Sequence, residues 1–344
     1  MNPAGAVDAI VVASFGGPEG PEDVMPFLEN VTRGRNVPPE RLLDVAEHYY
    51  ALGGVSPING QNRDLIAALE QLMSEAPEPA LPVFFGNRNW APFLADTVKD
   101  MAEAGVQHAA AYVTSAYAGF SSCRQYRDDI DRARASVGEA APRITKVRHF
   151  FDHPGFVEPL AGHCRDALLR LPEGVRQEAH VVFTAHSVPV AAAELAGPQG
   201  GAYVAQLAET ARLVAQRVGG EHPYRLVWQS RSGPPTQRWL VPDVNDHLGE
   251  VADSGATAVV VAPIGFVSDH VEVVHDLDQS ARETAERYGL AFARAETVGT
   301  APQFVAMIRE LVREIDDPTL DQSGLGDPAL RWSQCPRVCC GAVA

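Results

Sequence analysis

Two segments that follow short apolar runs carry the side chains best suited to chemistry in this chain. The run at 180–184 leads into His186, and the run at 258–261 leads into an acidic segment that contains Glu272. An imidazole can exchange a proton near neutral pH or bind a metal. Because functional side chains in open parallel sheets collect beyond the C-terminal ends of the strands, we expect His186 and Glu272 to form a facing pair.

A second carboxylate supports this hypothesis. Asp276 follows Glu272 by four residues, so both lie on one face of the helix expected at 271–288. Each feature alone has an ordinary structural explanation, since a lone histidine is commonly a core or turn residue and acidic residues commonly begin a helix. Together, an imidazole and a carboxylate suit a divalent first-row metal such as iron, and they also suit proton abstraction.

Composition and charge limit the class of protein. The chain has 344 residues, 46% of them apolar and 21% charged, which is typical of a globular protein with two domains of ordinary size. Its net charge of −16 argues against a nucleic-acid partner and means that an anionic substrate must be bound by local cations. It has no apolar run long enough for membrane insertion and no leader peptide, so we expect a cytoplasmic protein.

The alternation of short strands with longer helices predicts an α/β fold with parallel sheets covered on both faces. The pattern runs through the chain twice. We expect a first domain at 1–140, a second domain at 141–300, a final helix at 301–316 that packs back on the body, and a tail at 317–344. The expected strands are 10–15, 82–85, 108–114, 145–150, 180–184, 224–229, 258–261 and 290–295.

The sequence also resembles the ferrochelatase family, whose members insert Fe²⁺ into a porphyrin. Five segments carry the resemblance in the family's order and together span almost the whole chain. They are 14–18 (SFGGP), 52–58 (LGGVSPI), 183–189 (FTAHSVP), 228–242 (WQSRSGP followed by WLVP) and 263–272 (PIGFVSDHVE). The resemblance implies two similar Rossmann-like domains, each a parallel sheet flanked by helices, with the porphyrin in the cleft between them.

The resemblance gives the paired residues specific roles. It implies that His186 accepts protons from the pyrrole nitrogens as general base and that Glu272 binds Fe²⁺ or relays protons, with Asp276 behind it. The family often has tyrosine at the position of Phe15, whose ring has no oxygen to reach a metal and can only pack on the macrocycle. Ser280 similarly replaces a further carboxylate that the family often carries.

The acidic composition and the loop at 33–35 look most like the bacterial branch of the family that metallates coproporphyrin III. The four propionates of that substrate would need cationic and hydroxyl anchors. Each residue that could contact the porphyrin is also compatible with an ordinary loop or helix position. The candidates are Phe15, Arg33, Tyr49, Ser56 and Tyr126.

Three of the five cysteines, Cys335, Cys339 and Cys340, lie in the last ten residues. Since structural disulfides are rare in cytosolic proteins, this clustering suggests metal binding. Cys164 could supply a fourth thiolate, which would complete the ligand set of a [2Fe–2S] cluster, as in some members of the family, or of a zinc site. A tail with free thiols remains the alternative, and Cys123 is given no role.

The sequence leaves several functions open. The substrate could instead be protoporphyrin IX, although the lack of a membrane-docking segment favours the more water-soluble coproporphyrin III. A chelatase for another tetrapyrrole and metal is also compatible, as is a haem or metal carrier that uses the same cleft. We expect a monomer that binds coproporphyrin III and Fe²⁺ and does not bind nucleic acid.

Overall fold

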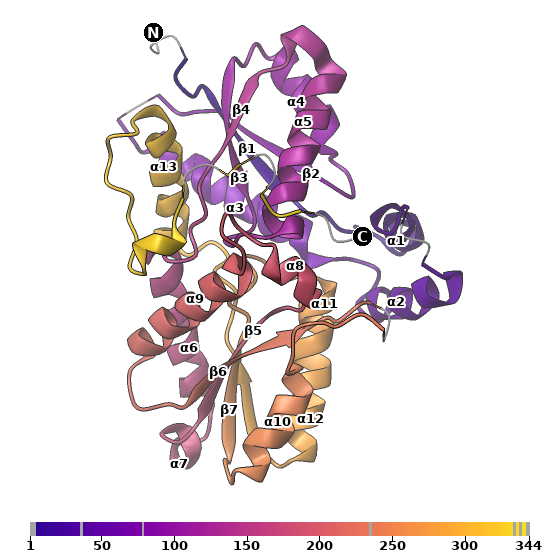
Figure 1. Cartoon of the computed structure of the whole chain (residues 1–344), viewed down its shortest axis with the longest axis vertical. Coiled ribbons are helices and arrows are strands. Elements are labelled where there is room, and N and C mark those ends of the chain that lie inside the picture. Colours follow the sequence, from indigo (N-terminus) through magenta and orange to yellow (C-terminus); the bar gives the residue numbers. More distant parts are fainter. Residues whose placement is uncertain are drawn as a thin grey trace.

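The computed structural model describes residues 5–34, 37–77, 79–233, 236–332, 335–336 and 339–341. Two four-stranded sheets lie one beyond the other along the molecule, each built from one half of the chain (Figure 1). Every pair of neighbouring strands in the two sheets is parallel. The α/β class expected from the alternation of strands and helices is therefore confirmed.

The two sheets have the same strand order. The first contains β1 (Ala9–Ser14), β2 (Val83–Asn87), β3 (His108–Val113) and β4 (Arg143–Lys146), in the order β2-β1-β3-β4. The second contains β5 (His180–His186), β6 (Tyr224–Gln229), β7 (Ala258–Ala262) and β8 (Ala291–Arg294), in the order β6-β5-β7-β8. In each sheet the chain passes from one side of its first strand to the other, which is the topological switch where α/β proteins bind ligands.

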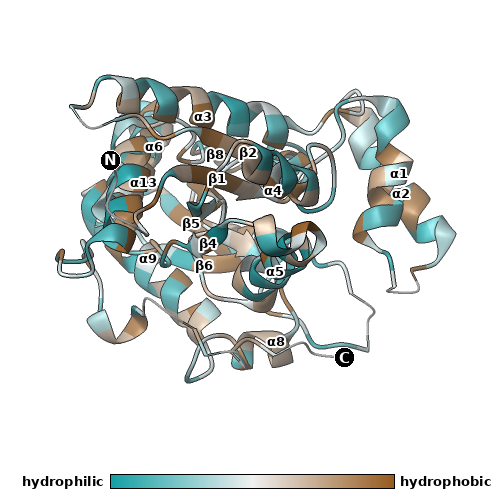
Figure 2. Cartoon of the chain, turned by 90° about the horizontal axis from the view of Figure 1, so that it is seen from above, coloured by the Kyte–Doolittle hydropathy of each residue, from teal (hydrophilic) through white to brown (hydrophobic). Residues whose placement is uncertain are grey.

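The central strands are buried because the helices of each half cover both faces of its sheet. All residues of β1, β3 and β7 are buried. These strands are rich in alanine and valine without polar alternation, as is typical of parallel sheets. Seen from above, hydrophobic strands lie inside helices whose outer faces are largely hydrophilic (Figure 2).

The helices fill the connections between strands. Those of the first half are α1 (Val24–Val31), α2 (Pro39–Ala51), α3 (Pro57–Ser74), α4 (Leu94–Glu103) and α5 (Gln125–Val137). Those of the second half are α6 (Pro154–Arg170), α7 (Glu173–Arg176), α8 (Val190–Glu194), α9 (Ala202–Val218), α10 (Val244–Asp253), α11 (Val271–Val273), α12 (Arg282–Arg287) and α13 (Pro302–Asp316). None of the helices in the described ranges combines the length and the apolar character needed to cross a bilayer.

The helix expected at 271–288 is not one regular α-helix. A π-helical segment, Val274–Ala281, separates α11 from α12. A second π-helical turn, Phe120–Arg124, precedes α5. Wider π-helical turns are frequent at functional sites. The first of these segments contains Asp276, and the second lies just before Tyr126.

The two halves share one hydrophobic core on the side of α3, α6 and α13. Its fully buried members include Val12 and Tyr112 from the first sheet and Phe183 from the second. Helix α13 follows the second sheet in the chain, yet it packs against α3 and β3 of the first half as well as against α6. A buried ion pair between Arg148 and Glu314, with an N–O distance of 2.7 Å, adds a polar link at this helix.

Helices α1 and α2 project from the body on another side of the molecule (Figures 1 and 2). They have a small core of their own, which includes Phe27 and Tyr49. Val271 of the second half belongs to the same buried cluster. The α1–α2 segment therefore reaches from the first half to the residue that precedes Glu272.

A glycine allows α6 and α13 to approach closely. A Cβ atom on Gly155 would lie 2.6 Å from the carbonyl oxygen of Gln303 and 2.7 Å from the Cβ of Met307.

We expect Gly155→Ala to lower the free energy of unfolding by about 1–3 kcal/mol, because the core would be overpacked. On the same helix, Gly162→Ala meets no atom closer than 3.8 Å and should instead stabilise the protein by up to about 1 kcal/mol. Urea unfolding compares the two variants, and equal stabilities would contradict the close approach.

Candidate active site

His186 is the last residue of β5, at the carboxyl edge of the second sheet. Its Nδ1 lies 2.5 Å from the carbonyl oxygen of Ser187. Because a carbonyl can only accept, Nδ1 carries the proton of this hydrogen bond. The backbone carbonyl of His186 accepts a hydrogen bond of 2.8 Å from the hydroxyl of Tyr203. These contacts leave Nε2 free to face Glu272.

Glu272 reaches His186 because the loop after β7 crosses the end of β5. The N–H of Gly265 donates to the carbonyl of Thr184 at 3.0 Å, and a Cβ atom on Gly265 would lie 2.5 Å from the Cβ of Ala185. Glycine is therefore needed at the crossing. The loop continues into α11, where the Oε2 of Glu272 lies 3.3 Å from the Nε2 of His186. The two side chains that we expected to form a pair are in direct contact.

Both members of the pair belong to the second half of the chain. Strands β5 and β7 are neighbours in one sheet, so the His186–Glu272 contact runs along the edge of that sheet. It does not bridge the two halves, as would residues on opposite walls of an interdomain cleft. The first half contributes the α1–α2 segment, which packs beside Glu272 through Val271.

The contact shifts the pKa of both groups. Burial acts to lower the pKa of His186, but the hydrogen bond and the charge of Glu272 outweigh it and hold that pKa above its ordinary value. Burial acts to raise the pKa of Glu272, yet His186, together with His270 and His48, lowers it to about 2. The two side chains are 34% and 39% exposed, so solvent reaches them. The contact therefore favours the protonated form of His186 and the ionised form of Glu272.

Asp276 lies in the π-helical segment and is held from the side of β6. Its Oδ2 accepts a hydrogen bond of 2.5 Å from the Oγ of Ser230 and one of 3.3 Å from the Nε2 of Gln229. Its Oδ1 lies 3.3 Å from the Nδ1 of His275. Asp276 therefore adds a fixed negative charge behind Glu272, and its orientation is set by three neighbouring side chains.

Two histidines that no sequence motif singles out stack beside the pair. The ring centroids of His48, on α2, and His275 are 3.7 Å apart, with an interplanar angle of 14°. Burial and the nearby His275 lower the pKa of His48, whereas the hydrogen bond with Asp276 raises that of His275. The stack connects the α1–α2 segment to the helix of Glu272. No spacing in the sequence indicates it, because the two rings come from different halves.

Two of the expected porphyrin contacts lie in an aromatic cluster close to the pair. The ring of Phe15 meets that of Phe27 with centroids 6.2 Å apart, and Phe27 meets Tyr49 at 5.8 Å. Phe15 is 39% exposed, so part of its ring is available to a ligand. Tyr49 is buried, and burial together with the charge of Glu272 raises its pKa. The aromatic cluster thus extends from the end of β1 to the carboxylate of the pair.

The other expected contacts are placed differently. Arg33 lies in an exposed turn after α1, and Arg35, which the sequence places in the same loop, is outside the described residues. Ser56 is buried at the start of α3. Tyr126 is buried beneath the guanidinium of Arg88, which lies 4.9 Å from its ring centroid, and burial raises its pKa to about 12. Neither buried hydroxyl can meet a propionate without movement of the residues above it.

The structure brings together a different set of cysteines from the one we expected. Cys164 is buried on α6 in the main core, where burial raises its pKa to about 12. Cys335 is close enough to Cys123 for the two thiols to affect each other: Cys335 raises the pKa of Cys123, and Cys123 lowers the pKa of Cys335. The Sγ atoms of Cys339 and Cys340 are 3.5 Å apart. Cys123 was overlooked because nothing in its spacing relates it to the tail.

Among the residues that the structure describes, no three histidine, cysteine or acidic side chains are grouped so that they could hold one metal ion. Two surface hollows lie away from the pair, one beside α4 and α5 and the other beside α10 and α12. The Nε2 of His186 and the Oε2 of Glu272 are in direct contact with each other. Any cation that approached the Oε2 of Glu272 would compete with His186 for this carboxylate.

Two α/β units with a common strand order, and a histidine and a carboxylate side by side at the edge of one sheet, define a chelatase-type protein. The chain belongs to the ferrochelatase family, because the sequence model described as Ferrochelatase matches residues 7–315. That match covers both sheets and most of the helices.

Relatives from actinobacteria support this membership. The chain is 57% identical over 313 residues to a protein from Nocardia farcinica named coproporphyrin III ferrochelatase, covering 90% of this chain and 88% of the relative. It is 53% identical over 344 residues to a protein of the same name from Frankia alni, covering 98% of this chain and 87% of the relative.

Solved structures of low sequence identity support the fold. The chain matches the sirohydrochlorin chelatase SirB from Bacillus subtilis subspecies spizizenii in complex with cobalt with a TM-score of 0.56 and 12% identity, covering 91% of this chain and 97% of that one. It matches SirB from Bacillus subtilis with Fe3+ with a TM-score of 0.55 and 13% identity, covering 90% and 97%. At these identities the likeness shows the chelatase-type fold alone.

We expect Glu272→Gln to lower the pKa of His186, because the carboxylate is what holds that pKa above its ordinary value against burial. NMR titration of the His186 ring in the wild-type protein and the variant measures the change. Glu283→Gln, on the neighbouring helix α12, is the control and should leave the His186 titration unchanged. A His186 pKa that is the same in Glu272→Gln and in the wild type would contradict the pairing.

Proposed function

We propose that this protein is an enzyme of haem biosynthesis that inserts Fe²⁺ into coproporphyrin III to give iron–coproporphyrin III. The contact of 3.3 Å between His186 and Glu272 at the carboxyl edge of the second sheet carries this proposal, in a chain that belongs to the ferrochelatase family. The names of the relatives support coproporphyrin III as the substrate. A substrate with four carboxylates is water-soluble, which suits a monomeric enzyme that works in the cytoplasm.

Metal insertion requires that the pyrrole protons leave and that the cation loses bound water. His186 is the general base, but its contact with Glu272 raises its pKa and so favours the protonated form, which cannot accept a proton. When Fe²⁺ binds Glu272, the carboxylate no longer stabilises the imidazolium. Burial then lowers the pKa of His186, the imidazolium releases its Nε2 proton to the solvent that reaches it, and the neutral imidazole can accept a proton from the pyrrole. Binding of the metal to Glu272 therefore prepares the base.

The surroundings of the pair support both steps. Asp276 contributes negative charge behind Glu272, which helps to compensate the cation for its lost hydration. The exposed part of the Phe15 ring offers a surface on which a macrocycle can pack. Because this ring has no oxygen, the protein gives the metal no ligand from the Phe15 position.

We further propose that the tail cysteines bind a [2Fe–2S] cluster. The indole N–H of Trp332 donates to the Sγ of Cys335 at 3.0 Å, and the N–H of Gly197 donates to the Sγ of Cys340 at 3.2 Å. Hydrogen bonds of this kind to cysteine sulfur tune iron–sulfur clusters. When bound, the cluster supplies one-electron redox chemistry. The metallation steps above do not depend on it, and a zinc ion would use the same thiolates.

His186→Ala should lower the rate of coproporphyrin metallation by about 10²-fold or more, because it removes the general base. Binding of coproporphyrin III, followed by quenching of its fluorescence, should be retained. The assay uses ferrous iron under anaerobic conditions and follows the absorption change on metallation. The control is His163→Ala, on α6, whose Nδ1 lies 3.2 Å from the carbonyl oxygen of Glu296; this variant should metallate at the wild-type rate. Wild-type turnover by His186→Ala would overturn the assignment of the base.

Protein purified without oxygen should contain iron and acid-labile sulfide and should absorb visible light in the absence of porphyrin. Cys335→Ala should lose this absorption together with the sulfide, while still metallating coproporphyrin III. Zinc without sulfide in the wild-type protein would replace the proposed cluster by a zinc site. The sulfide content of the purified protein therefore separates the two metal centres.

A further inference from the structure

Four carboxylates lie in the segment 269–278, and the inner two belong to the candidate site. These are Glu272 and Asp276, whereas Asp269 begins the segment and Asp278 lies in its π-helical part. Carboxylates this close together in the chain repel one another unless cations compensate their charge. The outer two therefore need a positive partner of their own.

Arg294 is that partner, and it binds both outer carboxylates. It is the last residue of β8, the strand at the edge of the second sheet. Its Nε and Nη2 donate to the two oxygens of Asp278 at 2.8 and 3.1 Å, and its Nη2 and Nη1 donate to the two oxygens of Asp269 at 2.9 and 3.3 Å. Nη1 also donates to the carbonyl of Ala295 at 3.3 Å. These five hydrogen bonds match the five N–H groups of a guanidinium.

The arrangement is largely shielded from solvent. The side chain of Arg294 is 11% exposed, and those of Asp269 and Asp278 are 17% and 31% exposed. Ion pairs that are partly buried are screened less than those on an open surface. A lysine here would keep the charge, but its ammonium group cannot bind two carboxylates through two oxygens each. The arrangement therefore requires a guanidinium and not a positive charge alone.

The two carboxylates that Arg294 binds lie at either end of the segment that carries Glu272. Asp269 precedes Glu272 by three residues, and Asp278 follows it by six. Between them the chain passes from α11 into the π-helical segment Val274–Ala281. Since π-helical runs are rare, contacts with the surroundings must favour this one over a regular α-helix. An arginine that binds both ends limits how the residues between them can turn.

Both anchors of this arrangement are fixed in place. The N–H of Asp269 donates to the Oε1 of Gln61, on α3 of the first half, at 2.8 Å. The N–H of Ala295, next to Arg294, donates to the carbonyl of Val261 on β7 at 2.8 Å. The beginning of the segment is thus bound to both halves of the protein, and the arginine extends from a strand that is paired with β7.

We propose that Arg294 is a positioning residue of the metal-binding site. By binding a carboxylate at each end of the segment 269–278, it holds Glu272 and Asp276 in the orientation that receives Fe²⁺. The inference rests on the proposed insertion of iron and assigns to that reaction a residue that acts through its neighbours. Because the arginine acts on the carboxylates, its loss should impair the use of Fe²⁺ and leave the binding of the porphyrin unchanged.

The test uses the full-length protein with Arg294→Lys or Asp278→Asn, each of which removes part of this arrangement. Initial rates are measured without oxygen at saturating coproporphyrin III and varied Fe²⁺. We expect kcat/KM for Fe²⁺ to fall by about 10–100-fold, as is typical when a residue behind a metal ligand is changed. The dissociation constant of coproporphyrin III, followed by fluorescence quenching, should stay at the wild-type value.

A second readout reports on the segment itself and does not depend on catalysis. Hydrogen exchange of the backbone amides at 269–281 is followed by mass spectrometry. Exchange should be faster in both variants than in the wild type, because the ends of the segment are no longer held and local opening becomes easier.

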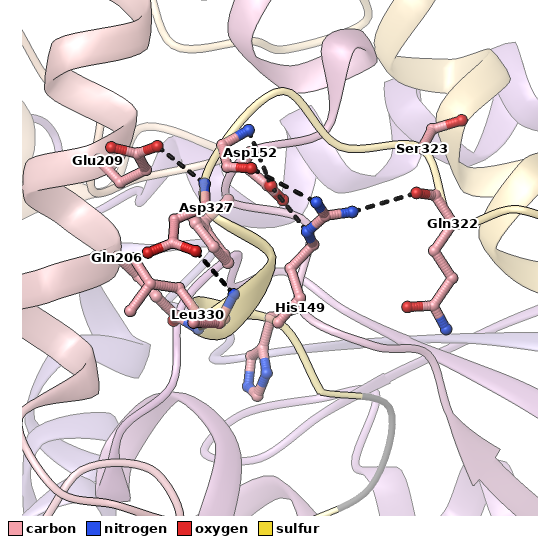
Figure 3. A network of polar contacts seen from close by, with 12 residues as sticks. His149, Asp152, Gln206, Glu209, Gln322, Ser323, Asp327 and Leu330 are labelled. Atoms are coloured by element: carbon pink, nitrogen blue, oxygen red, sulfur yellow. Dashed lines mark hydrogen bonds and ion pairs between the residues drawn. The ribbon is translucent and has the colours of Figure 1, made fainter.

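Arg331→Lys is the matched control. Arg331 is 16% exposed and forms an ion pair of 3.2 Å with the buried carboxylate of Asp152. Asp152 also accepts a hydrogen bond of 3.2 Å from the N–H of Gly326, within a polar network that holds the segment after α13 (Figure 3). The control therefore removes a guanidinium from a similar setting in a different network. It should keep the wild-type kcat/KM for Fe²⁺ and the wild-type exchange at 269–281.

Each outcome decides a separate point. Wild-type kcat/KM for Fe²⁺ in Arg294→Lys would overturn the inference, and so would an equal loss in Arg331→Lys, which would indicate a general loss of stability. A wild-type protein that does not metallate coproporphyrin III would overturn the proposed function. Faster exchange in Arg294→Lys would then still support the hold on the segment, whereas unchanged exchange would overturn both. If Arg294→Lys does not fold, as judged by circular dichroism, Asp278→Asn decides the same comparison.

Discussion

The contact between the imidazole of His186 and the carboxylate of Glu272 is the interaction on which the rest of the site depends. Each group stabilises the charged form of the other, which raises the pKa of His186 and lowers that of Glu272 to about 2. The nearby structure serves to form this contact. Strand β5 ends at the histidine, Gly265 lets the next loop cross it, and the π-helical segment holds Asp276 behind the glutamate. The charge of the carboxylate is therefore compensated within the protein by His186, a partner that the proposed metal ion would replace.

Much of the fold could be predicted because parallel strands buried on both faces leave a simple pattern in the sequence. Runs such as 258–261 contain no polar alternation, and the chemistry-bearing side chains follow them directly. His186 and Glu272 could be selected for that reason. Their position on one sheet could not, since the order of strands in a sheet is set by packing between segments distant in the chain.

The parts of the site that could not be predicted all depend on contacts between distant segments. The stacked rings of His48 and His275 come from different halves. The tail cysteines lie near the π-helical turn of Cys123 because Gln206 donates to the carbonyl of Leu330 and accepts from the N–H of Ala118. Arg124 and Arg127 add hydrogen bonds to tail carbonyls. Cys164 was expected as a possible fourth ligand from the cysteine cluster and the family resemblance, and the structure places its thiol in the core. Residue counts and spacings contain no information on which distant segments of the chain come into contact.

The position of α13 determines how the two halves are held together. Because this helix closes a core that contains side chains of both sheets, any hinge rotation of one half against the other would shear that core. The α1–α2 segment lies outside the shared core and meets the second half through the cluster around Val271 and the stacked histidines. Separating this segment from the second half would break those contacts and leave the shared core intact.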